Sequence, residues 1–187
     1  MADMNESMIW LNEPASWQAD PTRLVAVSKP QTDFWRLTHD GGLRDSGHFY
    51  HQHVAGDFTV QVHLEGQYES QFDQAGLMLR VDESHWIKCG IEYVDGRHLA
   101  SAVVTQGTSD WSTAPVNSGD GIDLMLKRSG DLIEISYRSI AEESPNLLRQ
   151  TTFAAPESVC LGVMLASPLG TGFRAVFSEF QIALGSN

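Results

Sequence analysis

Polar and apolar residues alternate along most of this chain with a period of two. In the segment 57–65, apolar residues occupy every even position and polar residues occupy every odd one. This alternation is typical of an antiparallel strand that has one face in the core and the other in water. Helical periodicity is nearly absent, which favours an all-β fold. The same alternation predicts further strands over 75–81, 86–94, 99–105, 122–127, 132–137, 160–167 and 173–184.

Turn signals separate these strands at hairpin spacing. Asp95-Gly96 and Ser129-Gly130-Asp131 each lie between two apolar runs, where such residues favour tight antiparallel turns. The segments 109–120 and 139–145 are polar and contain Pro or Gly, which predicts loops. Only 141–150 has room for a short helical turn, and Pro145 limits it. Many short strands joined in this way predict a sandwich or a barrel.

Length and charge exclude several classes of protein. The chain has 187 residues and a formal net charge of −12, so a single domain is expected, with residues 1–20 packed on it. The acidic excess argues against binding to nucleic acid or to an anionic membrane. No apolar run reaches 18 residues and no signal peptide is evident, so a cytoplasmic location is expected. Cys89 and Cys160 lie in apolar runs and are expected to be buried thiols.

The two faces of the predicted strand 86–94 differ in chemistry. One face is apolar and is predicted to be core: Ile87, Cys89, Ile91 and Tyr93. The other face combines an indole, an ammonium group, a gap and a carboxylate: Trp86, Lys88, Gly90 and Glu92. An aromatic ring beside polar groups is typical of a site that binds sugar by stacking and hydrogen bonding. Arg80 is expected on the same side, which predicts a charged concave surface; an ordinary solvent face with a Lys–Glu pair is the alternative.

The segment 34–50 is the densest in aromatic, histidine and arginine residues. Its polar side chains could converge on a site from a glycine-containing loop, or they could form an ordered turn closed by Arg–Asp pairs. His48, His51 and His53 suggest a metal site, but on a strand only His51 and His53 share a face. No cysteine or close carboxylate completes the set. A histidine-rich edge exposed to solvent is therefore preferred, and no metal or cofactor is predicted.

Catalytic signatures are weak. The sequence has no Gly-x-Ser-x-Gly motif and no glycine loop that leads into a helix to hold a nucleotide. A glycoside hydrolase needs two carboxylates at a suitable separation, for which Asp73, Glu83 and Glu92 are the candidates. They do not form a closely spaced motif on one strand, so an enzyme is the less favoured interpretation.

A set of short motifs extends through most of the chain: Phe34-Trp35-Arg36, Gly56-Asp57-Phe58, Asp73-Gln74-Ala75-Gly76-Leu77-Met78, Trp86-Ile87-Lys88, Gly90-Ile91-Glu92, Ser109-Asp110-Trp111-Ser112 and Gly172-Phe173. Between residues 20 and 184 the chain thereby resembles the DUF1349 family, a relative of the regulation-of-enolase proteins of yeast. The resemblance implies a concanavalin A-like lectin/glucanase fold, a two-sheet antiparallel jelly-roll sandwich. In that superfamily the concave sheet is the usual ligand surface, and related modules are attached to xylosidases.

Two departures from related patterns affect the functional interpretation. Retaining glucanases of similar fold carry acids at alternate positions of one strand, and this chain has no Glu-x-Asp-x-Glu run. Relatives also tend to carry an aromatic residue where this chain has His51. The first departure argues against a hydrolase, and the second argues against a metal site.

The combined prediction is a non-catalytic sandwich that binds a small carbohydrate or polar metabolite on its concave face. A regulatory protein that docks an enzyme of carbohydrate metabolism is one alternative, and a glycoside hydrolase using Glu83 or Glu92 is another. Trp86 and Trp111 are expected to stack on a sugar ring. The hydroxyl or carboxylate groups of the sugar are expected to bind to Arg80, Lys88 and Glu92, and the rim of the site is expected to be shaped by Asp73 and Gln74. The predicted contacts are Trp35, Arg36, His39, His48, Asp73, Gln74, Arg80, Trp86, Lys88, Glu92 and Trp111.

Overall fold

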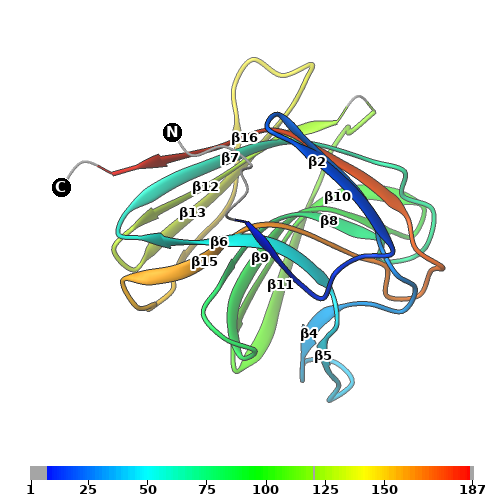
Figure 1. Cartoon of the computed structure of the whole chain (residues 1–187), viewed down its shortest axis with the longest axis horizontal. Coiled ribbons are helices and arrows are strands. Elements are labelled where there is room, and N and C mark those ends of the chain that lie inside the picture. The colour runs from blue at the N-terminus through cyan, green and yellow to red at the C-terminus, as the bar shows by residue number, and fades with distance from the viewer. Residues whose placement is uncertain (1–7, 120, 186–187) are drawn as a thin grey trace.

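The computed structural model describes residues 8–119 and 121–185, which form two stacked antiparallel sheets of seven strands each (Figure 1). The first sheet contains, in spatial order, β1 (Ile9–Leu11), β6 (His48–Ala55), β15 (Ser158–Ala166), β8 (Gln74–Arg80), β9 (His85–Val94), β10 (Arg97–Gln106) and β11 (Thr108–Pro115). The second contains β14 (Asn146–Thr152), β13 (Leu132–Ser139), β12 (Ile122–Ser129), β7 (Phe58–Gly66), β16 (Arg174–Leu184), β3 (Arg23–Val27) and β2 (Ser16–Asp20). The described residues contain no helix that could cross a membrane. The predicted jelly-roll sandwich is confirmed.

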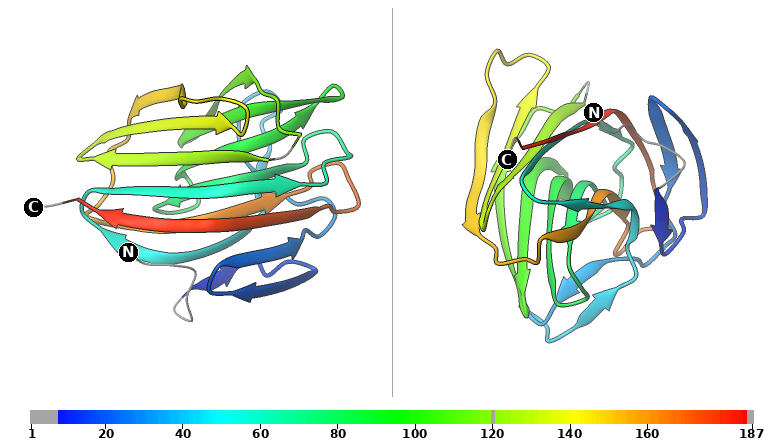
Figure 2. Two further views of the ribbon diagram at one scale, coloured as in Figure 1. Left: turned by 90° about the horizontal axis from the view of Figure 1, so that it is seen from above. Right: turned by 60° about the vertical axis from the view of Figure 1, so that its left-hand side comes forward.

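The main core lies between the two sheets, whose arrangement as facing layers can be followed in Figure 2. Apolar residues at even positions of β7 point into this core and are almost completely buried, as the alternation of the sequence predicts. Asp95 and Gly96 adopt positive φ angles of 50° and 75° in the tight turn between β9 and β10. Gly130, with a φ of 59°, turns β12 into β13. Both predicted hairpins are therefore confirmed.

Several segments differ from what the alternation of polar and apolar residues predicts. Most of the predicted loop 109–120 is instead strand: Thr108–Pro115 forms the edge strand β11, because its backbone pairs with β10 along eight residues. Asn146–Thr152 pairs with β13 as a strand and contains no helical turn. Tyr93 is only partly buried, since its ring lies against His98 at the sandwich rim. These strands are recognised by their backbone pairing and not by their side chains.

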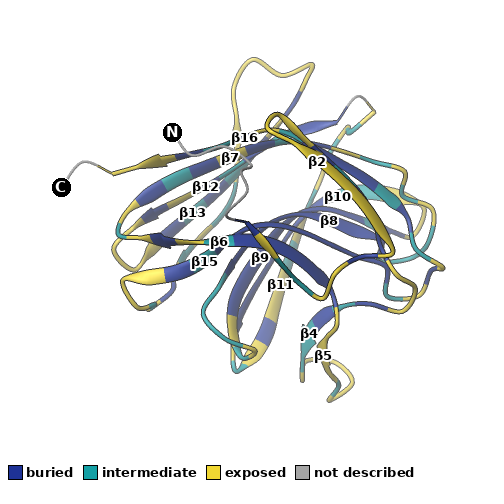
Figure 3. Ribbon diagram, in the orientation of Figure 1, coloured by how far each residue is buried: buried dark blue, intermediate teal, exposed yellow. Residues whose placement is uncertain are grey.

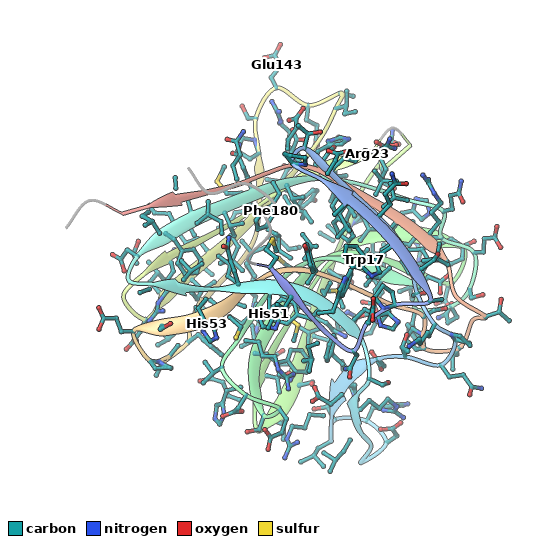
Figure 4. All side chains as sticks on the ribbon, viewed as in Figure 1. Trp17, Arg23, His51, His53, Glu143 and Phe180 are labelled. Atoms are coloured by element: carbon teal, nitrogen blue, oxygen red, sulfur yellow. The ribbon has the colours of Figure 1, made fainter. Side chains whose placement is uncertain are left out.

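The predicted histidine-rich edge is wrong. His48, His51 and His53 belong to β6, which is an inner strand because it pairs with β1 on one side and β15 on the other. His48 and His51 are buried, and of the three only His53 is exposed. Figure 4 shows the positions of His51 and His53 along β6. The Nδ1 atom of His53 lies 4.0 Å from the sulfur of Cys160 on β15. No group of three or more His, Cys, Asp or Glu side chains that could hold a metal ion is found in the described part of the chain.

The N-terminal segment contributes one strand to each sheet. β1 pairs with β6, and β2 pairs with β3. The Trp10 ring lies 5.8 Å from Trp17 and 4.9 Å from Tyr50, which packs the two strands together at this edge of the sandwich. Residues 1–7 of the predicted packed segment lie outside the described residues.

A two-stranded hairpin forms a third layer on the first sheet. Its strands, β4 (Phe34–Arg36) and β5 (Leu43–Asp45), lie on the side of that sheet away from the second one (Figure 1). This side is called the outer face here, and it corresponds to the predicted concave surface. The hairpin covers part of the outer face and buries a second apolar cluster, made of Phe34, Phe49, Met78, Trp86, Val103, Met164 and Ala166.

Candidate functional site

The hairpin buries one of the two tryptophans that were expected to stack on a sugar. The Phe34 ring of β4 lies 6.2 Å from Trp86, which exposes only 1% of its surface. Strand alternation does place Trp86 on the outer face, but the hairpin packs over it and excludes it from solvent. The strands β8 and β9 are coloured as buried along most of their length in Figure 3. The predicted stacking role of Trp86 is therefore wrong, because a packed ring has no free face for a ligand.

Arg80 links the β4–β5 hairpin to the first sheet. Its guanidinium group forms a bidentate ion pair with Asp45 of β5, with distances of 2.6 and 2.8 Å, and lies 5.8 Å above the Phe34 ring. Paired, planar contacts of this kind fix geometry. Arg80 therefore stabilises the position of the β4–β5 hairpin. Because its guanidinium group is already paired with Asp45, the structure does not support the predicted role of Arg80 as a ligand contact.

Two further predicted contact residues are internal anchors. Asp73 is fully buried and accepts hydrogen bonds from the Ser167 hydroxyl at 2.5 Å and the Ser70 amide at 2.8 Å. His48 is also buried: its Nε2 accepts the Lys29 amide, and its Nδ1 donates to the Asn12 carbonyl. Burial lowers the pKa of His48, in keeping with a neutral ring. Both residues position loops, and neither can touch a ligand or shape an open rim.

Lys88 forms the centre of a buried polar network at the boundary of the covered area. It exposes 5% of its surface and donates hydrogen bonds to the Phe34 carbonyl and the Gln74 side chain, both at 2.6 Å. A longer contact of 3.4 Å reaches Oδ1 of Asp33. Gln74 in turn donates to the Phe72 carbonyl at 3.1 Å. This network ties the hairpin and the segment before β8 to the sheet.

Glu92 lies beside this network, on β9, at the point where the hairpin cover ends. It exposes 7% of its surface, and its Oε2 accepts hydrogen bonds from the Ser101 hydroxyl at 2.7 Å and the Trp111 indole at 2.9 Å. Burial raises the pKa of Glu92, against the opposing attraction of Lys88. No hydrogen bond from residues 8–119 or 121–185 reaches its other oxygen, Oε1.

A hollow of about 10 Å³ opens above this carboxylate, between Gln74, Lys88, Gly90, Glu92, Ser101 and Met164. It is the size of one water molecule or one hydroxyl group. Gly90 makes close strand pairing possible at its floor, because a Cβ atom there would lie 1.9 Å from the Ala75 carbonyl oxygen. The hollow can therefore receive one polar group of a ligand but not a sugar ring.

Trp111 supplies a surface large enough for a ring. It exposes 41% of its surface, while its Nε1 is held by Glu92 and, at 3.0 Å, by the Ser101 hydroxyl. The Phe72 ring stands at 80° to the indole, with 6.5 Å between centroids. Hydrogen bonds thus fix the polar edge of the indole while part of its apolar surface remains open to solvent.

The other predicted residues do not join this site. Trp35 donates its indole N–H to the Thr38 carbonyl within the hairpin, and His39 lies exposed in the hairpin turn. Arg36 reaches the first sheet through its backbone amide, which donates to Ser109. Glu83 precedes β9, whereas Glu92 lies near the far end of that strand, so the two are separated by roughly 20 Å or more. That separation does not fit a pair of glycosidase carboxylates.

A larger hollow, of about 310 Å³, lies on the outward surface of the second sheet. Asp123 of β12 is one of its lining residues, with His63 Nδ1 at 2.8 Å and Arg138 Nε at 3.2 Å from its carboxylate. The alternation of the sequence gives no sign of this cluster, because its members come together only through strand register: His63 and Arg138 are the two direct cross-strand neighbours of Asp123. These hydrogen bonds and ion pairs lower the pKa of Asp123 despite partial burial. The carboxylate of Asp123 is therefore largely paired within the cluster, mainly with the guanidinium group of Arg138.

Comparisons with known proteins agree with this architecture. A family model described as "Protein of unknown function (DUF1349)" matches residues 10–184. Regulation of enolase protein 1 of Saccharomyces cerevisiae is 39% identical over 175 residues, covering 92% of this chain and 87% of the relative. A crystal structure of a functionally unknown protein from Saccharomyces cerevisiae has a TM-score of 0.90 at 35% identity, with 97% and 98% coverage of the two chains. The carbohydrate binding module CBM66 from Bacillus subtilis shares the fold, with a TM-score of 0.60, 13% identity and 96% and 98% coverage.

Proposed function

The chain belongs to the DUF1349 family of proteins of unknown function, and from that premise we propose that it binds a small carbohydrate on the open part of its outer face. Trp111 is the platform on which a sugar ring stacks, and Oε1 of Glu92 accepts a hydrogen bond from a ligand hydroxyl placed in the small hollow. Gln74 and Lys88 act by holding the walls of this site. Binding without catalysis fits these groups, since Glu83 lies far from Glu92.

One observation carries the proposal: Trp111 is half-exposed and yet fixed. An exposed tryptophan usually needs no explanation, but here a buried carboxylate and a buried hydroxyl hold its indole N–H. This arrangement orients the ring before any ligand arrives, which lowers the entropic cost of binding. The shared fold of the CBM66 module, which is named for carbohydrate binding, supports the same function.

Docking of a metabolic enzyme is a second candidate function. The name of the yeast relative refers to regulation of enolase, and Leu37 and Leu43 lie exposed on the β4–β5 hairpin. Exposed aliphatic residues on a projecting hairpin are suited to protein contact. This function predicts capture of a protein partner that depends on these leucines and not on Trp111.

Calorimetric titration with the methyl glycosides of glucose, galactose, xylose and mannose tests the carbohydrate proposal. We expect at least one to bind, and Trp111→Ala to weaken it by about 1–3 kcal/mol, roughly 5- to 150-fold in Kd, through loss of the stacking surface. Trp17→Ala is the matched control, because Trp17 is also 41% exposed but lies on the edge strand β2.

Thermal unfolding of both variants shows whether they remain folded under the titration conditions. Binding that Trp17→Ala weakens as much as Trp111→Ala would exclude the proposed location. Absence of binding to all four glycosides would overturn the proposal, and a Leu37→Ser/Leu43→Ser variant would then test protein docking.

A further inference from the structure

Every hydrogen-bond donor at the small hollow is already engaged by the protein. The three N–H groups of Lys88 point to the Phe34 carbonyl, to Gln74 Oε1 and to Asp33 Oδ1. A lysine ammonium group has only three donors, so none remains for a ligand. Lys88 thus contributes charge and rigidity but offers no hydrogen bond to a sugar.

The neutral groups around the hollow are engaged in the same way. The Ser101 hydroxyl and the Trp111 indole both donate to Oε2 of Glu92. The amide of Gln74 donates to the Phe72 carbonyl at 3.1 Å and, at 3.4 Å, to Asp33 Oδ1. A ligand group that can only accept hydrogen bonds therefore finds no free side-chain donor among these residues.

Two carboxylate oxygens at the site, in contrast, remain available to accept a hydrogen bond from a ligand. Within the described part of the chain, no hydrogen bond reaches Oε1 of Glu92 or Oδ2 of Asp33. Asp33 retains a side-chain exposure of 14%, so its free oxygen is within reach of solvent. The two carboxylates lie close enough that the charge of Asp33 contributes to the raised pKa of Glu92. Lys88 is the only cation among the residues that line the hollow.

From this pattern we propose that the site selects sugars that donate hydrogen bonds, meaning neutral and amino sugars, and rejects uronic acids and sugar phosphates. An added carboxylate or phosphate in the hollow would face the carboxylates of Glu92 and Asp33, and it would find no free side-chain donor among Gln74, Lys88 and Ser101. In such a partly buried place like charges repel strongly. An ammonium group would instead donate to Glu92 and Asp33. This inference rests on the proposed carbohydrate function and specifies its ligand class.

Two matched series of sugars test the selection at pH 8. Each holds the ring and the methyl group at C1 constant and changes one substituent. One series contains the methyl glycosides of glucose, glucosamine and glucuronic acid, and the other contains those of galactose, galactosamine and galacturonic acid. We expect the neutral and amino members of a series to bind at least 10-fold more tightly than its uronic acid. A uronic acid that binds as tightly as its neutral counterpart overturns the selection but leaves carbohydrate binding in place. If no member of either series binds, the proposed function itself fails, and this inference fails with it.

Glu92→Gln tests the cause of the selection. Ser101 and Trp111 still need an acceptor, so the amide oxygen replaces Oε2 and the new NH₂ group turns toward the hollow as a donor. The preference for the neutral sugar over its uronic acid should then fall at least 5-fold. Asp123→Asn is the control, because it removes the same charge from the second sheet and should leave the preference unchanged.

Asp33→Asn gives an independent test if Glu92→Gln does not fold. It converts the second open acceptor, which is partly buried, into an amide. It should also reduce the preference for the neutral sugar over its uronic acid. An unchanged preference in whichever of these variants folds would overturn the proposed cause.

Discussion

Trp86 and Trp111 lie on the same face of the same sheet, yet they have opposite environments. Trp86 exposes 1% of its surface and Trp111 exposes 41%. Both indole N–H groups are engaged, by the Glu83 carbonyl in one case and by Glu92 and Ser101 in the other. The difference comes from the β4–β5 hairpin, whose Phe34 covers Trp86. Strand alternation therefore decides which face a side chain occupies, whereas a distant segment decides whether that face meets solvent.

Polar side chains on the outer face also differ between the part that the hairpin covers and the part that it leaves open. In the covered part, the ion pair of Arg80 with Asp45 and the contacts of Lys88 with Phe34 and Gln74 hold the third layer in place. At its boundary, Glu92 still has an unused oxygen. A charged residue on the outer face thus has a structural role where the cover is complete, and it is available for binding only where the cover ends.

The largest expected effect is on Trp86, the covered ring. Trp86→Ala should lower the free energy of unfolding by about 3–5 kcal/mol, because it leaves a cavity beneath Phe34. Urea unfolding of the purified protein measures this loss. Trp17→Ala, at an exposed edge, should cost clearly less. A loss below about 1 kcal/mol at Trp86 would show that the hairpin does not cover it in solution.

Sequence patterns predicted the faces of the strands because side-chain direction is a local property. The period of two places Trp86, Lys88 and Glu92 together, as the structure confirms. Their surroundings depend on long-range contacts: Asp33 approaches Lys88 from 55 positions earlier in the chain. Alternation reports no such contact, so Lys88 and Arg80 were interpreted as ligand-binding groups when they are structural.

The strand that carries Trp111 was less predictable. The segment 109–120 is rich in polar residues and was predicted to be a loop, but an edge strand needs only backbone partners on one side. Trp111 was identified through the family motif Ser109-Asp110-Trp111-Ser112. The His63–Asp123–Arg138 cluster was missed for a similar reason, since its members come together only through the register of three strands.

The pH dependence of stability should distinguish Glu92 from Asp123. The folded-state pKa of Glu92 is raised above its ordinary value of 4.5, so ionisation costs more in the folded protein than in the unfolded one. Its contribution is present below pH 4.5 and is lost as the pH rises through the raised value. Asp123 has a lowered pKa, so its contribution is present above 3.8 and is lost as the pH falls.

Urea unfolding between pH 3 and pH 8 measures both effects. Relative to Glu92→Gln, the wild-type protein should become less stable as the pH rises. Relative to Asp123→Asn, it should become less stable toward the acid end. Parallel profiles for the wild type and Glu92→Gln would mean that this carboxylate is well solvated, and would remove the contrast between the two sites.

Trp111→Phe should have the smallest effect on stability, about 1 kcal/mol. It keeps an aromatic surface but removes one of the two donors to Oε2 of Glu92, which still accepts the Ser101 hydroxyl. Sugar affinity should fall less than in Trp111→Ala, since part of the stacking surface remains. A stability loss approaching that of Trp86→Ala would instead place Trp111 in the core of the protein. The contrast between the two rings would then disappear, and the open part of the outer face would lose Trp111 as the proposed platform for a ligand.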